Sequence, residues 1–343
     1  MMAVRFHQHG GPEVLRYEEA PDPAPGDAEV LLQVRAVALN HLDVWLRKGL
    51  PGMKVSLPKI GGCDVAGLVA AVGSRCARIR AGQRVLVSPG ISCGQCAACL
   101  RGDDNLCRDF QMVGGYTLDG GCAEFLAVPE VNCIVLPPEM DFAEAAAIPV
   151  TFLTAWHMLI RLGRLQAGER LLVMGAGSGV GTAAIQIGRL VGARVIAVAG
   201  SQEKLARARD LGAEAGIDHT AQGLAQEVRR LTERRGVDVV FEHVGGTTWG
   251  ALLPNIAPGG RLVTCGATAG YETSVDIRYL FSRNIAILGA HLGTKAEMLE
   301  VVGHVARGAL HAVVDRVLPL AECAAGHRLL EERAVFGKVV LTP

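Results

Sequence analysis

The chain has 343 residues, 50% of them hydrophobic, and its 34 basic and 34 acidic residues give a formal net charge of zero. This length allows two domains, each with its own core, and the balanced charge argues against nucleic acid or an acidic membrane as a partner. No hydrophobic run approaches a transmembrane helix and the first residues lack a signal-peptide core, so we expect a soluble cytoplasmic protein.

The first 150 residues are predicted to be β-rich. Short Val- and Leu-containing runs at 30–37 and 84–87 are separated by clusters of Gly and Pro. Near the end of this region, Asp141 is predicted to cap a helix over 143–147 that Pro149 ends, and a second helix is predicted over 151–165.

Four closely spaced cysteines follow the second of these strands. Three thiols at two-residue intervals and a fourth after a short loop can surround one ion, and four thiolates suit tetrahedral zinc without leaving an open coordination position. We therefore predict one structural zinc per chain, with disulfides as the alternative. Residues 101–105 are expected to form an exposed turn within this zinc lobe, residues 93–107. The predicted ligands are Cys93, Cys96, Cys99 and Cys107.

After residue 168, hydrophobic strands alternate with amphipathic helices. This alternation predicts a parallel sheet covered on both faces, and right-handed crossovers make it doubly wound. The predicted strands cover 170–174, 194–198, 237–241, 261–265 and 285–288, and helical stretches at 203–211 and 224–231 lie between them.

A glycine-rich turn joins the first of these strands to a helix over 182–190. Glycines permit a tight turn and close approach of a pyrophosphate, and the helix N-terminus supplies free N–H groups. The complete strand–turn–helix–strand context predicts a dinucleotide site. Its predicted residues are Gly175, Gly177, Ser178, Gly179, Val180 and Gly181.

The end of the second strand bears on the choice of cofactor. A site that prefers NAD(H) usually places an acid there, but this chain has Ala199, followed by Ser201 and Lys204. A hydroxyl and an ammonium can bind a 2′-phosphate, so NADP(H) is predicted over NAD(H). In the alternative interpretation, Ser201 caps the next helix and Lys204 is a surface lysine.

The cysteine lobe, the glycine turn and the strand-like tail at 337–342 together resemble the medium-chain dehydrogenase/reductase superfamily over essentially the whole chain. The resemblance implies an α/β fold in which a Rossmann domain (151–290) accompanies a β-rich GroES-like catalytic domain (1–150, completed by 291–343). It also implies a cleft between the domains. Homodimers, or homotetramers built from them, are implied to form through the edge strand at 285–288.

Zinc alcohol dehydrogenases of this superfamily carry ligands that this chain has lost. By that resemblance, Asn40 replaces the ligand cysteine, Leu42 the proton-relay hydroxyl, and Val150 the third ligand. The family's Gly-His-Glu segment becomes Gly62-Cys63-Asp64 here, leaving Cys63, Asp64 and an improvised His41. The resemblance therefore implies a site without catalytic zinc, which needs about three protein ligands.

Quinone oxidoreductases offer a better match. Asn40, Asp43, Trp45 and Arg47 are similar to their Asn-x-x-Asp-x-aromatic-x-Arg pattern, which places Asn40 toward the nicotinamide, and Thr154 sits where they have a threonine near that ring. The four-cysteine lobe departs from that group. The chain thus combines a structural zinc lobe with a site of zinc-free type.

Three candidate catalytic residues each have two possible interpretations. His41 is a general acid or a structural histidine, and Cys63 is a reactive thiol or inert packing. Asp43 hydrogen-bonds cofactor or substrate, or it caps the helix at 44–48. Asp64 is expected to balance a cation such as an arginine.

Two further segments are candidate cofactor contacts. Cys265, Gly266 and Ala267 follow a strand, where ligands of open α/β sheets bind, and the resemblance places them near the nicotinamide. His219 takes the place of a tyrosine that quinone oxidoreductases hold against the adenosine phosphate, or it is a solvated loop residue.

The predicted function is an NADPH-dependent reductase of quinones, enones or small aldehydes, in which the cofactor supplies the hydride. The alternatives are a zinc-dependent alcohol dehydrogenase with degenerate ligands and a non-catalytic NADPH-binding protein of the same fold. In each enzymatic case the partner is a small carbonyl compound or alcohol.

Overall fold

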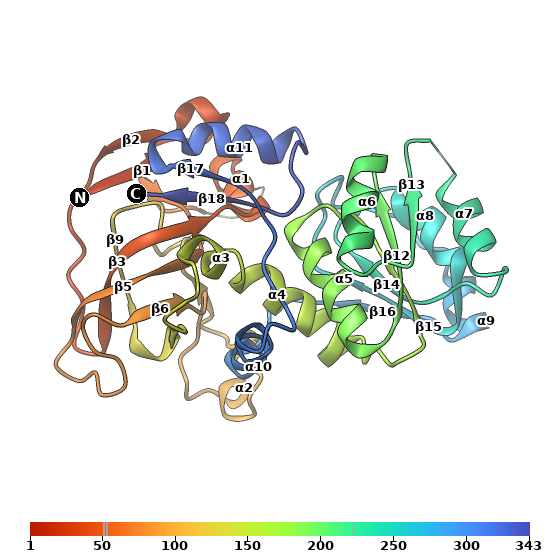
Figure 1. The fold of residues 1–343 in the computed structure, drawn as a ribbon, viewed down its shortest axis with the longest axis horizontal. Helices are drawn as coiled ribbons and strands as arrows, with labels where there is room; N and C mark the ends of the chain where they lie inside the picture. Colours follow the sequence, from red (N-terminus) through yellow and green to blue (C-terminus); the bar gives the residue numbers. More distant parts are fainter. Residues whose placement is uncertain (51, 53, 222) are drawn as a thin grey trace. The chain divides into compact units, whose positions relative to one another are not determined.

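The computed structural model describes residues 1–50, 52, 54–221 and 223–343. It divides the chain into two compact units (Figure 1), of which unit 1 comprises Met1–Val150 with Thr294–Pro343 and unit 2 comprises Thr151–Gly293. The chain thus re-enters unit 1 three residues after the boundary expected at 290. Within the described residues, no helix combines the length and the apolar character needed to cross a membrane.

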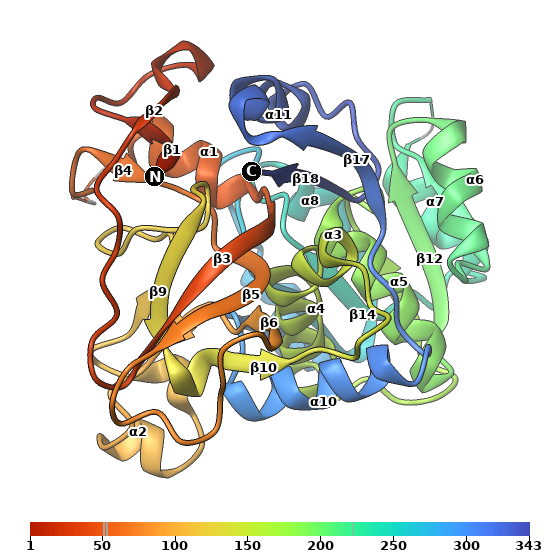
Figure 2. The ribbon, with the colours of Figure 1, turned by 60° about the vertical axis from the view of Figure 1, so that its left-hand side comes forward.

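Unit 1 is built on a seven-stranded sheet in the order β10-β6-β5-β3-β18-β17, with β9 also paired to β3. The C-terminal segment joins this sheet because β18 pairs antiparallel to β3, and both chain ends lie in this unit (Figure 2). The strands are β3 (Glu29–Ala38), β5 (Asp64–Val72), β6 (Arg84–Val87), β9 (Phe125–Pro129), β10 (Cys133–Val135), β17 (Val314–Pro319) and β18 (Lys338–Thr342).

In the described part of unit 1, two small sheets and five helices complete the fold. The sheets are β2-β1-β4, formed by Arg16–Glu19, Met2–Phe6 and Lys59–Ile60, and β7-β8, formed by Gly90–Ile91 and Gln111–Met112. The helices are α1 (His41–Lys48), α2 (Ala97–Leu100), α3 (Phe142–Ala146), α10 (Lys295–Ala306) and α11 (Cys323–Glu331). Short 3-10 turns cover η1 (Pro12–Val14), η2 (Asp104–Leu106), η3 (Glu130–Asn132) and η6 (Leu320–Glu322).

Unit 2 contains a six-stranded parallel sheet in the order β13-β12-β11-β14-β15-β16. This is the strand order of a doubly wound dinucleotide-binding fold. Its expected dimer strand, β16, lies at the sheet edge, and its pairing with a second copy stays a prediction. The strands are β11 (Arg170–Val173), β12 (Arg194–Ala199), β13 (Ala215–Asp218), β14 (Val237–Glu242), β15 (Ile256–Thr264) and β16 (Ala286–Gly289).

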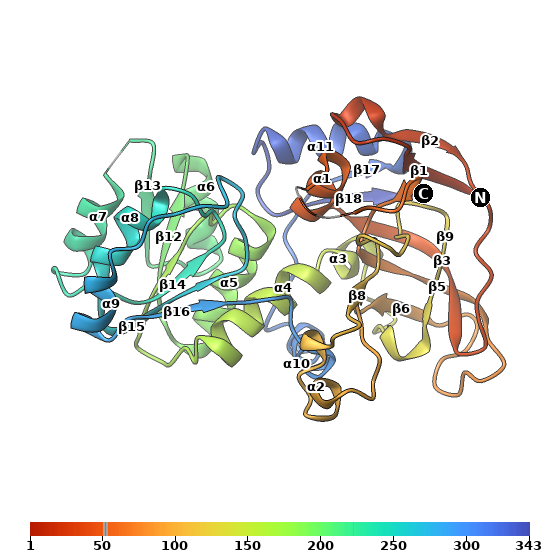
Figure 3. The same cartoon turned by 180° about the vertical axis from the view of Figure 1, so that it is seen from behind.

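Helices cover both faces of this sheet. Figures 1 and 3, which view opposite sides, show α5 and α6 on one face and α8 and α9 on the other, as right-handed crossovers require. The elements are α4 (Pro149–Trp156), α5 (Gly179–Val191), α6 (Gln202–Asp210), α7 (Leu224–Leu231), α8 (Thr248–Leu252), the 3-10 turn η5 (Leu253–Asn255) and α9 (Ile277–Arg283).

Two sequence predictions need correction, and one strand was missed. Asp141 caps α3 as expected, but Pro149 begins α4 instead of ending the preceding helix, because a proline at the first helical position needs no N–H partner. The helix predicted over 151–165 continues after Trp156 as a π-helix that ends at Leu162. The short strand β13 was not predicted.

Candidate functional site

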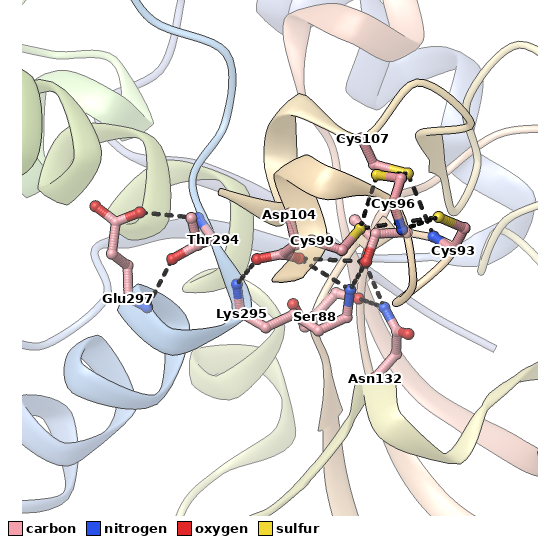
Figure 4. A network of polar contacts seen from close by, with 12 residues as sticks. Ser88, Cys93, Cys96, Cys99, Asp104, Cys107, Asn132, Thr294, Lys295 and Glu297 are labelled. Atoms are coloured by element: carbon pink, nitrogen blue, oxygen red, sulfur yellow. Dashed lines mark hydrogen bonds and ion pairs between the residues drawn. The ribbon is translucent and has the colours of Figure 1, made fainter. Parts of the chain in front are cut away.

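The four cysteines lie together in the zinc lobe, where Cys99 is on α2, Cys96 precedes α2 and Cys107 follows η2 (Figure 4). Their Sγ atoms all lie within 4.8 Å of one another, with separations of 3.5 Å for Cys96–Cys99, 3.8 Å for Cys96–Cys107 and 4.0 Å for Cys93–Cys99. Four sulfurs at 2.3 Å from a tetrahedral zinc would be separated by about 3.8 Å. The donor set and its spacing therefore fit the predicted zinc.

Backbone N–H groups prepare part of this site for metal. The N–H of Gln95 lowers the pKa of the Cys93 thiol, and the N–H of Cys99 lowers that of Cys96 to about 6. Thiols must ionise to bind zinc, so these hydrogen bonds favour the ligand form. Within the described parts of the chain, no other set of three or more His, Cys, Asp and Glu side chains is close enough to hold an ion.

The loop between the third and fourth cysteines is only partly the exposed turn that the sequence predicted, because Arg101 and Gly102 form an exposed turn but the residues that follow are partly or fully buried. Asn105 is only 4% exposed, and Asp104 faces α10. Asp104 Oδ1 accepts from the Lys295 backbone N–H (3.1 Å), and its Oδ2 lies 3.1 Å from Lys295 Nζ, which also donates to Ser92 Oγ (2.9 Å). Figure 4 shows this contact beside the capping box of Thr294 and Glu297, so the zinc lobe helps to cap α10.

A second polar cluster in unit 1 joins Asn40, Cys63, Asp64 and Lys338. The central strand β3 brings them together, because its last residue, Ala38, pairs with Asp64 on one side and with Val340 on the other. Asn40 follows β3, Asp64 begins β5 and Lys338 begins β18. Asp64 and Cys63 are fully buried, and Lys338 is 4% exposed.

The contacts within this cluster use both oxygens of the carboxylate. Lys338 Nζ lies 2.9 Å from Asp64 Oδ2 and donates to Asn40 Oδ1 over 2.6 Å, while Asn40 Nδ2 donates to Asp64 Oδ2 over 2.8 Å. Asp64 Oδ1 accepts from the backbone N–H of Val150 over 2.8 Å. The cation expected beside Asp64 is therefore a lysine, not an arginine.

This arrangement does not fit a catalytic zinc. The Asn40 amide and the Lys338 ammonium both point hydrogens at Asp64, and an ammonium next to the carboxylate repels a metal ion. Burial and the neighbouring carboxylate of Asp64 raise the pKa of the Cys63 thiol well above its usual value. Cys63 is thus a neutral thiol near Asn40 Nδ2 (3.3 Å) and a poor nucleophile.

The other residues singled out near Asn40 have structural partners. Asp43 Oδ2 accepts from the Asn40 backbone N–H (2.7 Å) in a capping box, and its Oδ1 accepts from the Gly62 N–H (2.8 Å), which agrees with the capping interpretation. His41 begins α1, with its ring edge-on to Trp45. Arg47 is fully buried and paired with Glu331 at 2.8 Å.

The glycine-rich turn of unit 2 has the geometry of a phosphate-binding turn. Gly175 adopts a left-handed φ of +57°, and a Cβ on Gly181 would lie 2.4 Å from the Gly175 carbonyl oxygen, so neither position accepts a side chain without a shift. Ser178 caps α5 by accepting from the Gly181 N–H (3.0 Å). The segment Gly177 to Val180 thus opens a helix whose N-terminus can receive a pyrophosphate.

At the end of β12, the structure supports the capping role of Ser201. Its hydroxyl accepts from the Lys204 N–H over 3.3 Å at the start of α6. Ala199 is paired in register with Asp218, whose carboxylate accepts from Thr220, and the Thr220 hydroxyl lowers the pKa of Asp218. An ionised acid therefore lies one strand away from position 199. The exposed His219 follows Asp218, with its ring against Gly200.

The remaining cofactor candidates lie in unit 2. Thr154 lies on α4 and is 6% exposed. Cys265 follows β15, and burial raises its pKa to about 12, which keeps the thiol neutral. Gly266 lies against the backbone of His243, and Ala267 against Gly245, so the segment 265–267 packs on the loop that follows β14.

Three residues with a clear structural role were missed from the sequence. Glu242 is fully buried at the end of β14, and its carboxylate accepts from the Val244 and Gly245 N–H groups and from the Trp249 and Thr264 side chains. It therefore fixes the loop at the carboxyl end of the sheet.

His243 lies beneath the glycine turn, 3.0 Å from the Met174 carbonyl and 3.2 Å from Ser178 Oγ, and burial lowers its pKa. The sequence signal that could have identified Glu242 and His243 was an acid followed by a histidine at the end of a hydrophobic strand. Lys338, in the polar cluster of unit 1, is the third.

Comparison with known proteins agrees with these features. Residues 26–138 match the family model described as an alcohol dehydrogenase GroES-like domain, and residues 179–307 match that of a zinc-binding dehydrogenase. An alcohol dehydrogenase of Schizosaccharomyces pombe is 28% identical over 99% of this chain and 97% of its own length. A quinone oxidoreductase of Pseudomonas aeruginosa is 31% identical, with 99% of each chain covered.

Among solved structures, one described as an NAD-dependent alcohol dehydrogenase is 46% identical, covers 100% of both chains and superposes with a TM-score of 0.96. The two family models, the full-length relatives and this superposition agree with the cysteine lobe and the glycine turn. The chain therefore belongs to the medium-chain dehydrogenase/reductase superfamily of NAD(P)-dependent oxidoreductases.

Proposed function

We propose that the protein is an NAD(P)H-dependent reductase of quinones, enones or small aldehydes that works without a catalytic zinc. The observation that carries this proposal is the hydrogen-bonded cluster in which Lys338 contacts Asn40 and Asp64, because the resemblance places Asn40 and Asp64 where related enzymes hold their zinc site. An ammonium and an amide take the place of a metal there, and Cys63 is a neutral thiol.

In this proposal, these residues act on the acceptor through electrostatic interactions. The bound dinucleotide supplies the hydride. Lys338 contributes a buried positive charge, and Asn40 holds its ammonium in place while Asp64 balances it. A fixed positive charge favours negative charge that develops on an acceptor oxygen. Without a Lewis acid, the acceptors that suit this site are those already activated toward hydride, such as quinones and enones.

A zinc-dependent alcohol dehydrogenase is the second candidate, because relatives carry the name alcohol dehydrogenase and one similar solved structure is described as a cobalt- and zinc-bound alcohol dehydrogenase. It would need zinc to bind Cys63, Asp64 and His41 after Lys338 had moved away from Asp64. A non-catalytic NADPH-binding protein is the third, and it would bind cofactor tightly without turnover of any carbonyl compound.

Metal content and acceptor choice test these candidates together. We expect one zinc per chain by elemental analysis, and NADPH or NADH oxidation with quinones or enones that persists under mild chelation while the lobe zinc is retained. A second bound zinc, or ethanol oxidation that disappears in a folded Cys63→Ser variant, would establish the alcohol dehydrogenase instead. Tight cofactor binding with no turnover would support the non-catalytic protein.

Cofactor preference is the finer part of the proposal. We propose that NADPH binds more tightly than NADH, because Ala199 leaves room beside the Ser201 hydroxyl and the Lys204 ammonium. Asp218 acts against this preference, since its ionised carboxylate lies on the neighbouring strand.

Ala199→Asp should reverse the order of the two dissociation constants. A second negative charge about 4 Å from the 2′-phosphate would cost on the order of 1–4 kcal/mol, or about fivefold or more in NADPH affinity. Ala199→Asn is the matched control, because it adds similar bulk without charge. Fluorescence titrations that give tighter NADH binding in the wild-type protein would overturn the preference.

A further inference from the structure

Four arginines line one surface pocket of unit 2, away from the glycine-rich turn. The pocket has a volume of about 380 Å³ and is lined by Arg229, Arg234, Arg235 and Arg283, together with Asn255 and Tyr279. It lies where β14 and β15 begin, whereas the glycine turn follows the carboxyl end of β11. Because β11, β14 and β15 run parallel, the pocket and the dinucleotide site lie at opposite ends of the sheet.

Nearby acids neutralise only one of these arginines. Arg235 makes two hydrogen bonds to Asp238, at 2.8 and 3.0 Å. Arg229 donates through Nε to Asn255 Oδ1 (3.1 Å), and Arg283 donates through Nη1 to the Pro254 carbonyl (2.9 Å), which are neutral partners. In each of these two guanidiniums, Nη2 has no hydrogen-bonded or ionic partner within the described residues, and the Arg283 guanidinium lies 5.3 Å from the centroid of the Tyr279 ring.

Arg234 is the most available of the four. It is exposed, and among the residues that the structure describes its guanidinium has no hydrogen-bonded or ionic partner. Its backbone and that of Glu233 both adopt left-handed conformations, with φ of +65° and +51°. Residues other than glycine are disfavoured in this backbone conformation, and residues held in it concentrate at ligand-binding sites.

The chain's overall charge does not account for this concentration of arginines around the pocket. Its basic and acidic residues are equal in number, so three guanidiniums without a paired acid around one pocket are a local feature. Guanidinium groups match the oxygens of a phosphoryl group with paired hydrogen bonds, and Tyr279 lines the same pocket. The volume exceeds that of one phosphate ion and suits a small phosphorylated compound.

We propose that this pocket binds a small phosphorylated metabolite, with Arg234 as the main phosphoryl contact and Arg229 and Arg283 beside it. This site is separate from the dinucleotide site and does not depend on the proposed reductase activity. The ligand's phosphoryl oxygens would accept from the free guanidinium nitrogens, and the affinity would fall as ionic strength rises.

Pyrophosphate is a suitable probe, titrated by calorimetry into the full-length protein saturated with dinucleotide. Saturation keeps the probe out of the glycine turn. We expect one site per chain, weakened by added salt, and an approximately tenfold loss of affinity in Arg234→Gln, as for a lost charge-assisted hydrogen bond. Inorganic phosphate should bind more weakly than pyrophosphate.

Arg209→Gln is the matched control, because Arg209 is an exposed arginine of α6 that also has no side-chain partner among the described residues and does not line the pocket. Its affinity for pyrophosphate should stay within about twofold of the wild type. Should Arg234→Gln fail to fold, as judged by circular dichroism and dinucleotide binding, Arg229→Gln provides the same test. Absence of millimolar binding to the wild-type protein, or an equal loss in Arg209→Gln, would overturn the proposal.

Discussion

Lys338→Met should reduce the free energy of unfolding by about 3–5 kcal/mol, because it leaves the buried Asp64 carboxylate without its counter-ion. Asp64 is fully buried and Lys338 is 4% exposed, so water cannot replace the ammonium without opening β18 away from β3. The substitution should also abolish turnover if the buried cation supports the acceptor oxygen. Denaturant unfolding gives the magnitude, and hydrogen exchange of the β3 and β18 amides locates the loss.

Two variants give this prediction its controls. Lys48→Met breaks an ion pair to Glu331, but Lys48 is 54% exposed, and surface pairs contribute only about 0–1 kcal/mol. Asp64→Asn in the Lys338→Met background removes the unpaired negative charge of the buried carboxylate and should restore part of the stability. An equal loss in Lys338→Met and Lys48→Met, or no recovery in the double variant, would show that the buried charge pair is not what holds this cluster together.

The sequence predicted features whose determinants are close together in the chain. The cysteine spacing and the strand–glycine–helix pattern are local, and so is Asp141 capping α3. The structure contains the expected helix α7 over Leu224–Leu231 and the expected parallel sheet. The short β13 escaped prediction because Ala215 and Gly216 have weak strand propensity, and only its pairing with β12 makes it a strand.

Three of the four residues of the polar cluster were identified from the sequence. Asn40, Cys63 and Asp64 were singled out, and a cation beside Asp64 was expected. Lys338 was not identified as that cation, because the two residues are 274 positions apart and no local pattern links them. The same limitation applied to Asp104, whose partner Lys295 is 191 positions away, and it explains why residues 101–105 were expected to be exposed.

Cys99→Ala should cause the loss of zinc from the lobe and lower the free energy of unfolding by several kcal/mol, because metal binding to this site adds to folding free energy. Three sulfurs would remain around the ion. The loss should spread beyond residues 93–107, since Asp104 caps the first turn of α10 through the Lys295 N–H. Hydrogen exchange should therefore accelerate both in the lobe and at the start of α10.

Cys76→Ala is the matched control, because Cys76 is a half-buried thiol outside the lobe that packs against the core of unit 1 and whose Sγ lies near the Asp27 and Glu29 backbone carbonyls. It should keep one zinc per chain and nearly wild-type stability. Asp104→Asn separates the two consequences of zinc loss, because it removes the charge that faces Lys295 without removing a sulfur ligand. It should weaken α10 while the zinc stays bound. Wild-type protein that contains no zinc, or a Cys99→Ala variant with unchanged zinc content and melting temperature, would contradict the structural role of the ion.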